Sequence, residues 1–259
     1  ITTLHGTDIT LVGSDPSYET VTRFSLQRSD GLTAVSEYLR RETIERFGVS
    51  CERIHTIPNF VDLSEYRRDR DACHRSQFAA PDEKVLMHIS NFRPVKRMED
   101  VVRVFGRVSR RIPSRLVLIG DGPDRGRAEQ AAIEEGVASR VRFLGKQESV
   151  ADLLACADLF LLPSQLEAFG LVALEAMACG VPVVACRVGG IGEVVPEAEA
   201  GMLAPVGAID EMAEHAVSIL ADADRWRRMS AAARAAAARF DADRIVPMYE
   251  AFYREVLSQ

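Results

Sequence analysis

Short apolar runs alternate with helical patterns through the middle of the chain, and this alternation restricts the fold more than any other feature. Five runs predict strands near residues 85–90, 115–119, 141–145, 158–162 and 181–186. The segments between them predict helices near residues 98–111, 124–135, 149–156 and 171–179. Strands separated by helices pair in parallel through right-handed crossovers. The sequence therefore predicts an α/β fold built on a parallel sheet.

Further elements flank this region on both sides. Ahead of it, the pattern predicts strands near residues 1–4, 31–35 and 53–57 and helices near 16–27 and 36–47, the second capped by Ser36. After residue 200 the chain is predicted to be helical, over 209–221, 225–240 and 243–257. We expect residues 1–65 to be the end of one α/β domain, 66–84 a charged linker, 85–240 a second domain and 241–259 a final helix.

Residues 163–182 place one glutamate in a polar loop and a second on a helix. Glu167 lies in the loop, Glu175 lies on the helix, and Gly180 with Pro182 ends it. The free N–H groups at the start of this helix, beside Gly170, attract phosphate by dipole and hydrogen bonds. A nearby carboxylate can hold hydroxyls. The combination predicts a sugar-nucleotide site, and the alternative is that both glutamates are solvated charges flanking the helix.

A basic loop follows the apolar run that ends at residue 89. It contains Asn91, Arg93 and Lys96. The guanidinium of Arg93 can grip phosphate oxygens and Lys96 supplies a compact charge, so together they can neutralise a diphosphate leaving group in place of a metal. Open α/β sheets bind ligands at the carboxyl ends of their strands. The alternative is a solvated basic turn.

Glycines follow three of the predicted strands. Gly120 and Gly122 come after the run at 116–119, Gly145 ends the run at 141–145, and Gly189–Gly190 follows the run at 181–186. Such residues let the backbone approach a ligand closely, and backbone near residue 145 could read a base edge. A simple strand-to-helix turn explains the first pair equally well.

The E-A-F-G-L-V-A-L-E segment from Glu167 to Glu175 resembles the signature of retaining GT-B glycosyltransferases of the glycogen-synthase-like, family 4 type. In that family the first glutamate contacts the donor sugar and the second binds the nucleotide ribose. The family's R-x-x-K pair matches Arg93 and Lys96, and its G-x-G-P loop matches 120–123. The donor contacts that the resemblance implies are Asn91, Gly120, Gly122, Gly145, Phe169, Gly170, Leu171 and Glu175.

The resemblance also implies a GT-B fold, with a complete C-terminal Rossmann-like domain and the tail of an N-terminal one. We expect the amino-terminal portion of the fold to be missing from this chain, and therefore expect the 259 residues alone to bind nucleotide weakly and to transfer sugar poorly. In such enzymes the last helix crosses back onto the first domain. Tyr249, Phe252 and Tyr253 could make that contact, or could pack within their own domain.

The segments 4–13, 23–25, 29–30, 33–36 and 57–62 are similar to those of a subfamily that acts in bacillithiol biosynthesis. The similarity implies transfer of N-acetylglucosamine from UDP-N-acetylglucosamine to the hydroxyl of L-malate, with retention. Thr7 and Arg23 would bind the acceptor, since a small dicarboxylate needs cations and hydroxyls. Two alternatives remain: a GT-B transferase with another donor, such as GDP-mannose or UDP-glucose, and another sugar or lipid acceptor, or a non-catalytic nucleotide-sugar-binding module.

His5 follows an apolar strand and precedes Gly6, where a strand opens onto the cleft. In this family a histidine there contacts the donor sugar; the alternative is a loop histidine with no task. Asp8 could orient His5 or cap the following turn. With His5, the residues predicted to be catalytic are Arg93, Lys96 and Glu167. No nucleophile is evident, so the implied route is a same-face substitution in which the departing diphosphate helps to deprotonate the acceptor hydroxyl.

Composition agrees with a small-molecule enzyme. The net charge of −6 argues against nucleic acid as a partner, and we predict neither a membrane partner nor a metal or other cofactor. Five cysteines without C-x-x-C spacing predict reduced thiols and a cytoplasmic location. The sequence leaves open whether the protein is a monomer or a homo-oligomer.

Overall fold

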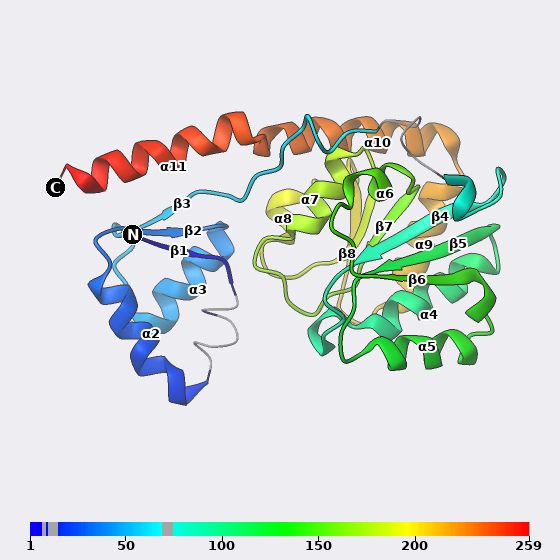
Figure 1. Ribbon diagram of the computed structural model, residues 1–259, viewed down its shortest axis with the longest axis horizontal. Coiled ribbons are helices and arrows are strands. Elements are labelled where there is room, and N and C mark those ends of the chain that lie inside the picture. Colours follow the sequence, from blue (N-terminus) through cyan, green and yellow to red (C-terminus); the bar gives the residue numbers. More distant parts are fainter. Residues whose placement is uncertain (7–8, 10–14, 69–74, 259) are drawn as a thin grey trace.

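The computed structural model describes residues 1–6, 9, 15–68 and 75–258, which form two lobes (Figure 1). The smaller lobe holds a three-stranded parallel sheet in the order β1 (Thr2–Leu4), β2 (Leu32–Ala34), β3 (Ile54–Thr56). Helices α2 (Pro16–Arg28) and α3 (Glu37–Phe47) lie on one face of this sheet. Ser36 caps α3 as predicted, because its Oγ accepts a hydrogen bond from the Leu39 amide at 3.1 Å.

The larger lobe contains a six-stranded parallel sheet in the order β6-β5-β4-β7-β8-β9. Its strands are β4 (Lys84–Ile89), β5 (Ser114–Ile119), β6 (Val141–Gly145), β7 (Leu159–Leu162), β8 (Val183–Cys186) and β9 (Gly201–Ala204). The strand order reverses between β4 and β7, which pair directly with Leu86 opposite Leu159. Open α/β sheets bind ligands at this kind of switch point, outside the carboxyl ends of the strands.

Both faces of the larger sheet are buried, because successive residues of β4 enter different cores. Val85 and Met87 belong to the core that includes α7 (Leu171–Ala178) and α6 (Ala151–Ala155). Leu86 belongs to the opposite core, with α4 (Met98–Ser109), α5 (Arg125–Glu134) and α9 (Ile209–Leu220). A parallel sheet with helices on both faces requires such apolar strands. The α/β prediction is therefore confirmed.

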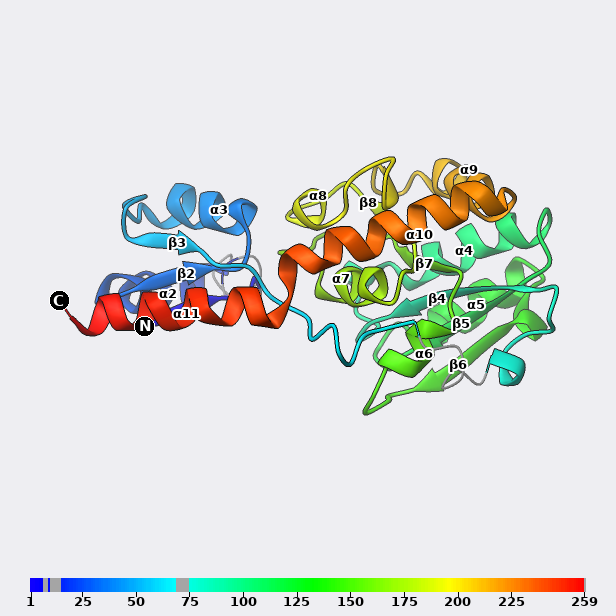
Figure 2. The same cartoon turned by 90° about the horizontal axis from the view of Figure 1, so that it is seen from above.

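Helix α10 (Ala223–Ala237) packs on the larger lobe, and α11 (Ala242–Leu257) returns to the smaller one (Figures 1 and 2). Tyr249 Oη donates to Ile57 O at 3.0 Å, and Phe252 is buried beside Ile57. Of the two placements left open for these aromatics, contact with the first domain is confirmed for Tyr249 and Phe252. Tyr253 is 41% exposed.

The chain after residue 200 is not purely helical, which corrects the sequence prediction. Gly201–Ala204 forms β9 and pairs with β8, and the short helix α8 (Ile191–Val194) precedes it. The β9 segment is only four residues long and has glycine and alanine at its ends, so its strand propensity is low. Pairing with β8, a tertiary effect, makes it a strand.

The prediction of reduced cysteines holds for some residues and is wrong for another. Cys51, Cys179 and Cys186 carry free thiols, whereas Cys156 takes part in a disulfide. Cys73 lies outside the described residues. Among the helices of the described part of the chain, none has both the length and the apolar character that a membrane span needs.

Candidate active site

A cation and a carboxylate meet where the strand order reverses. Lys96 lies at the end of the short 3-10 helix Pro94–Lys96 after β4, and Glu167 lies in the loop after β7. Lys96 Nζ is 2.6 Å from Glu167 Oε1, and their side chains are 19% and 11% exposed. The Gln165 amide donates to Val95 O at 2.8 Å, which ties the two loops together. The structure thus joins the two motifs that the sequence analysis treated separately.

Arg93 and Asn91 belong to the same loop as Lys96 but are exposed. Arg93 occupies the position just before the 3-10 helix, and its backbone carbonyl accepts a hydrogen bond from the Lys96 amide at 2.8 Å. The guanidinium is therefore open to solvent on the loop that holds the Lys96 ammonium. A planar donor beside a compact charge suits a diphosphate.

Two glycine loops pack against the backbone of this site. Gly120 has φ +117°, and a Cβ there would lie 1.8 Å from Ser90 O, so only glycine fits beside the basic loop. Gly189 has φ +53°, and a Cβ there would lie 1.8 Å from Glu167 O. The Gly120 amide also donates to Gly145 O at 2.8 Å, which holds the ends of β5 and β6 together. The predicted loops at 120–122, 145 and 189–190 thus surround the same end of the sheet.

Helix α7 begins beside Glu167, at Gly170, and no side chain caps its amino end. Leu171 is 39% exposed. Phe169, by contrast, is buried, and its ring contacts that of Phe240 edge-on at 5.5 Å between centroids. The Phe169 side chain is therefore part of the core, and only its backbone is available to a donor. The uncapped amides fit an anion, as the sequence predicts.

Glu175 is half-buried on α7, one turn beyond the amino end of that helix. Burial raises the pKa of Glu175 to about 7, and the negative charge of Glu65 adds to the rise. A hydrogen bond with the Tyr66 side chain acts in the opposite direction on the same pKa. A half-buried carboxyl with a raised pKa is a candidate for binding hydroxyl groups. Hydroxyls that donate hydrogen bonds to it would favour its ionised form.

His88 supports the site and was missed from the sequence, where it reads as the interior of an apolar strand. It is fully buried in β4; Nδ1 lies 2.8 Å from Leu161 O and Nε2 lies 2.8 Å from Ser90 Oγ. Burial lowers the pKa of His88 to about 4, so the ring is neutral. Through these bonds it links the carboxyl ends of β4 and β7, just before the Lys96 and Glu167 loops.

The smaller lobe places Gly6 beside the Glu167 loop, whereas His5 lines a separate cavity of about 340 Å³ with Phe60 and Tyr249. His5 is exposed, and a Cβ on its neighbour Gly6 would lie 2.4 Å from Ala168 Cβ, next to Glu167. Arg23 donates to Phe47 O at 2.7 Å and pairs with Glu19 at 2.8 Å, at the end of α3 remote from the larger lobe. In this conformation Arg23 is therefore engaged by groups of the smaller lobe itself. Thr7 and Asp8 lie outside the described residues.

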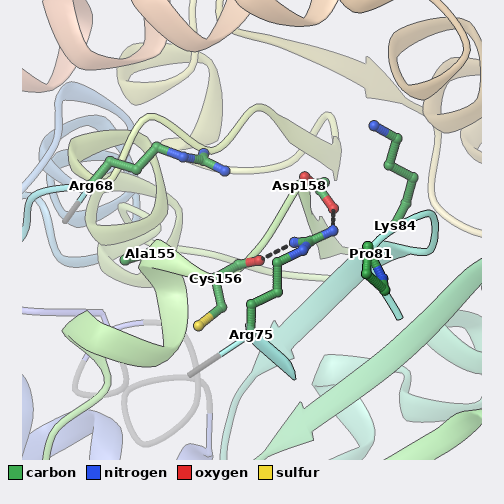
Figure 3. A pocket seen from close by; sticks show the side chains of 7 residues that line it. All are labelled: Arg68, Arg75, Pro81, Lys84, Ala155, Cys156 and Asp158. Atoms are coloured by element: carbon green, nitrogen blue, oxygen red, sulfur yellow. Dashed lines mark hydrogen bonds and ion pairs between the residues drawn. The ribbon is translucent and has the colours of Figure 1, made fainter. Parts of the chain in front are cut away.

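A cavity of about 360 Å³ opens at the opposite end of the larger sheet (Figure 3). Arg68, Arg75 and Lys84 line it, together with Asp158 at the start of β7. Arg75 pairs with Asp158 at 2.6 Å, and Arg68 lies over the Trp226 ring at 4.7 Å. Two of these cations are thus engaged by the protein itself. Because this is the amino end of the strands, we place the candidate active site at the Lys96 end.

Within the described ranges, no cluster of three or more histidine, cysteine, aspartate or glutamate side chains could hold a metal ion.

The chain belongs to the family of glycosyl transferases group 1, whose model matches residues 69–236, and residues 1–65 match the model of glycosyltransferase family 4. The fold is that of the GT-B glycosyltransferases. The chain is 44% identical over 259 residues to N-acetyl-alpha-D-glucosaminyl L-malate synthase of Bacillus anthracis, covering 99% of this chain and 68% of that protein. It is 34% identical over 226 residues to D-inositol 3-phosphate glycosyltransferase of Nocardia farcinica, covering 83% of this chain and 50% of that protein.

Solved structures show the same architecture. Sucrose-phosphate synthase from Thermosynechococcus elongatus superposes with a TM-score of 0.86 and 26% identity, covering 99% of this chain and 67% of that one. Anabaena HepE in complex with UDP-glucose superposes with a TM-score of 0.88 and 25% identity, covering 99% and 71%. The chain thus spans about two thirds of these structures, and about half of the inositol phosphate enzyme.

Proposed function

We propose that the protein transfers N-acetylglucosamine from UDP-N-acetylglucosamine to the hydroxyl of L-malate, with retention of configuration. The observation that carries the proposal is the 2.6 Å contact between Lys96 Nζ and Glu167 Oε1 at the switch point of the larger sheet. It puts a cation for the leaving group and a carboxylate for the sugar side by side. The relative from Bacillus anthracis, 44% identical, supports this choice of donor and acceptor.

In the proposed reaction the diphosphate binds between Lys96, Arg93 and the amino end of α7. Positive charge there stabilises the negative charge that develops on the leaving group, and such electrostatic stabilisation contributes on the order of 10²-fold or more to a rate. When the donor binds, Lys96 leaves its ion pair with Glu167 and pairs with phosphate oxygens instead. Glu167 can then accept hydrogen bonds from the hydroxyls of the sugar. We propose that no metal is needed, because two side chains and helix amides supply the positive charge.

Glu175 would hold the ribose hydroxyls, and His5 would approach the donor sugar from the smaller lobe. The departing diphosphate would help to take the proton of the malate hydroxyl, as in a same-face substitution. We propose that the acceptor binds to the smaller lobe.

The test is to mix the protein with UDP-N-acetylglucosamine and L-malate in a chelating buffer and to identify products by mass. The proposal expects UDP and an N-acetylglucosaminyl malate in equal amounts, formed at the low rate expected of these 259 residues. Parallel reactions with GDP-mannose or UDP-glucose, and with an inositol phosphate as acceptor, test the alternatives. A glycoside formed only in those reactions would contradict the proposed substrates. UDP-N-acetylglucosamine that binds without any release of UDP would contradict the transferase activity itself.

A further inference from the structure

The two lobes meet at the amino end of α3, beside the candidate active site. Ser36, immediately before α3, is 1% exposed, and its Oγ donates to Ala168 O at 2.5 Å. Ala168 follows Glu167 in the loop after β7. A Cβ on Gly190 would lie 3.0 Å from Ser36 Cβ, which shows how closely the lobes approach here. This contact joins residues that are more than one hundred positions apart in the sequence.

Glu193 of α8 caps α3 from the other lobe. Its Oε2 accepts the Glu37 amide at 2.8 Å, and its Oε1 accepts the Tyr38 amide at 2.8 Å. Ser36 Oγ accepts the next amide, that of Leu39, at 3.1 Å. The first amides of a helix have no partner within the helix, and a carboxylate there also interacts favourably with the helix dipole. One side chain of the larger lobe thus satisfies two donors of the smaller lobe.

The same segment of the larger lobe reaches Glu167. Glu193 follows the Gly189–Gly190 turn by three residues, and the Gly190 amide donates to Glu167 O at 3.0 Å. Glu167 in turn pairs with Lys96. A continuous set of hydrogen bonds therefore runs from the amino end of α3, through Glu193 and the glycine turn, to the pair at the switch point.

We propose that Glu193 is a positioning residue: as a helix cap between the lobes, it holds the arrangement in which Gly6 lies against Ala168 of the Glu167 loop. The effect of Glu193 on catalysis rests on the proposed function, whereas its role as a helix cap between the lobes does not. Without the two accepted bonds, the amino end of α3 keeps the Ser36 hydrogen bond to Ala168 but loses two others to the larger lobe, so the lobes separate more often. Chemistry that needs groups from both lobes then slows, while the donor loops of the larger lobe stay intact.

The experiment compares Glu193→Ala, which removes both acceptors, with Glu193→Gln, which keeps the size and one acceptor oxygen. Glu197→Gln is the matched control, since Glu197 lies four residues away and pairs with exposed Arg187 on its own lobe. Hydrogen exchange of the Glu37 and Tyr38 amides is measured in the 259-residue chain, together with the radius of gyration in solution. Helix caps of this kind slow opening on the order of tenfold, so we expect about tenfold faster exchange at these two amides in Glu193→Ala.

We expect Glu193→Gln to be intermediate and Glu197→Gln to match the parent chain. The radius of gyration should grow in Glu193→Ala. Unchanged exchange and an unchanged radius in a folded Glu193→Ala would overturn the proposal; if that variant does not fold, the same result in Glu193→Gln overturns it.

Kinetics separate this inference from the proposed function. If the parent chain transfers sugar, Glu193→Ala should lower kcat about tenfold and leave KM for UDP-N-acetylglucosamine within about twofold, because the donor loops are unaltered. A parent chain that transfers no sugar at all, not even at the low rate expected of these 259 residues, contradicts the function. Faster exchange in the variant then still supports the cap. A parent chain that transfers sugar, with kcat unchanged in Glu193→Ala, contradicts the positioning role.

Discussion

Glu175 should destabilise the unliganded protein at neutral and alkaline pH, and Glu175→Gln should relieve that cost. Burial raises the pKa of this carboxyl from its ordinary 4.5 to about 7. Between these two values the folded protein holds a proton that the unfolded chain does not. The stability that this bound proton contributes to the folded protein is therefore fully present below pH about 4.5 and is lost as pH rises through 7. At about 1.4 kcal/mol per pKa unit, ionised Glu175 costs about 3 kcal/mol at pH 8.

The assay is urea unfolding of the parent chain and of Glu175→Gln between pH 5 and pH 8. The amide cannot ionise and keeps the shape of the side chain, so the stability of the variant relative to the parent should rise by about 2.5 kcal/mol from pH 5 to pH 8. Exposed Glu199→Gln is the control and should change with pH as the parent does. A difference between Glu175→Gln and the parent that stays constant across this range would refute the reasoning.

Further predictions follow from other parts of the site. Lys96→Ala should lower turnover on the order of 10²-fold without unfolding the protein, whereas Lys84→Ala, at the far end of the sheet, should not; comparable rates in both would contradict the leaving-group role. Burial lowers the pKa of His88 to about 4, so as pH falls below 6.5 the unfolded chain binds a proton at this residue before the folded protein does. The parent should thus lose about 3 kcal/mol more than His88→Gln between pH 7 and pH 4, and equal losses in urea titrations would argue against a buried neutral ring. Gly189→Ala should displace the Glu167 loop and abolish transfer, because the new Cβ would lie 1.8 Å from Glu167 O; Gly192→Ala, with nothing within 4 Å, is the matched control, and a fully active Gly189→Ala would show that the loop tolerates the shift.

Much of this site could be predicted because its residues belong to local patterns. Arg93 and Lys96 follow a strand, Glu167 precedes a helix, and parallel strands bring their carboxyl ends to one edge. Ser36 was recognisable as a helix cap for the same reason. Such features can be predicted from the residues immediately before and after them in the sequence.

The residues that were missed depend on tertiary contacts. His88 alternates with apolar neighbours in β4, so its hydrogen bonds to Leu161 and Ser90 leave no trace in the sequence pattern. Glu193 was not singled out from the sequence, because the amides whose hydrogen bonds it accepts lie 155 and 156 positions away. Arg23 was assigned to the acceptor from its chemistry alone, whereas the fold engages it with Phe47 O and Glu19.

The most direct test of the central claim is a structure of the protein with bound UDP. The account predicts the diphosphate within hydrogen-bonding distance of Lys96 Nζ and of the backbone amides that open α7, with Lys96 released from Glu167 and the ribose hydroxyls on Glu175. A diphosphate bound instead in the cavity of Arg68, Arg75 and Lys84, with the Lys96–Glu167 pair unbroken, would contradict it.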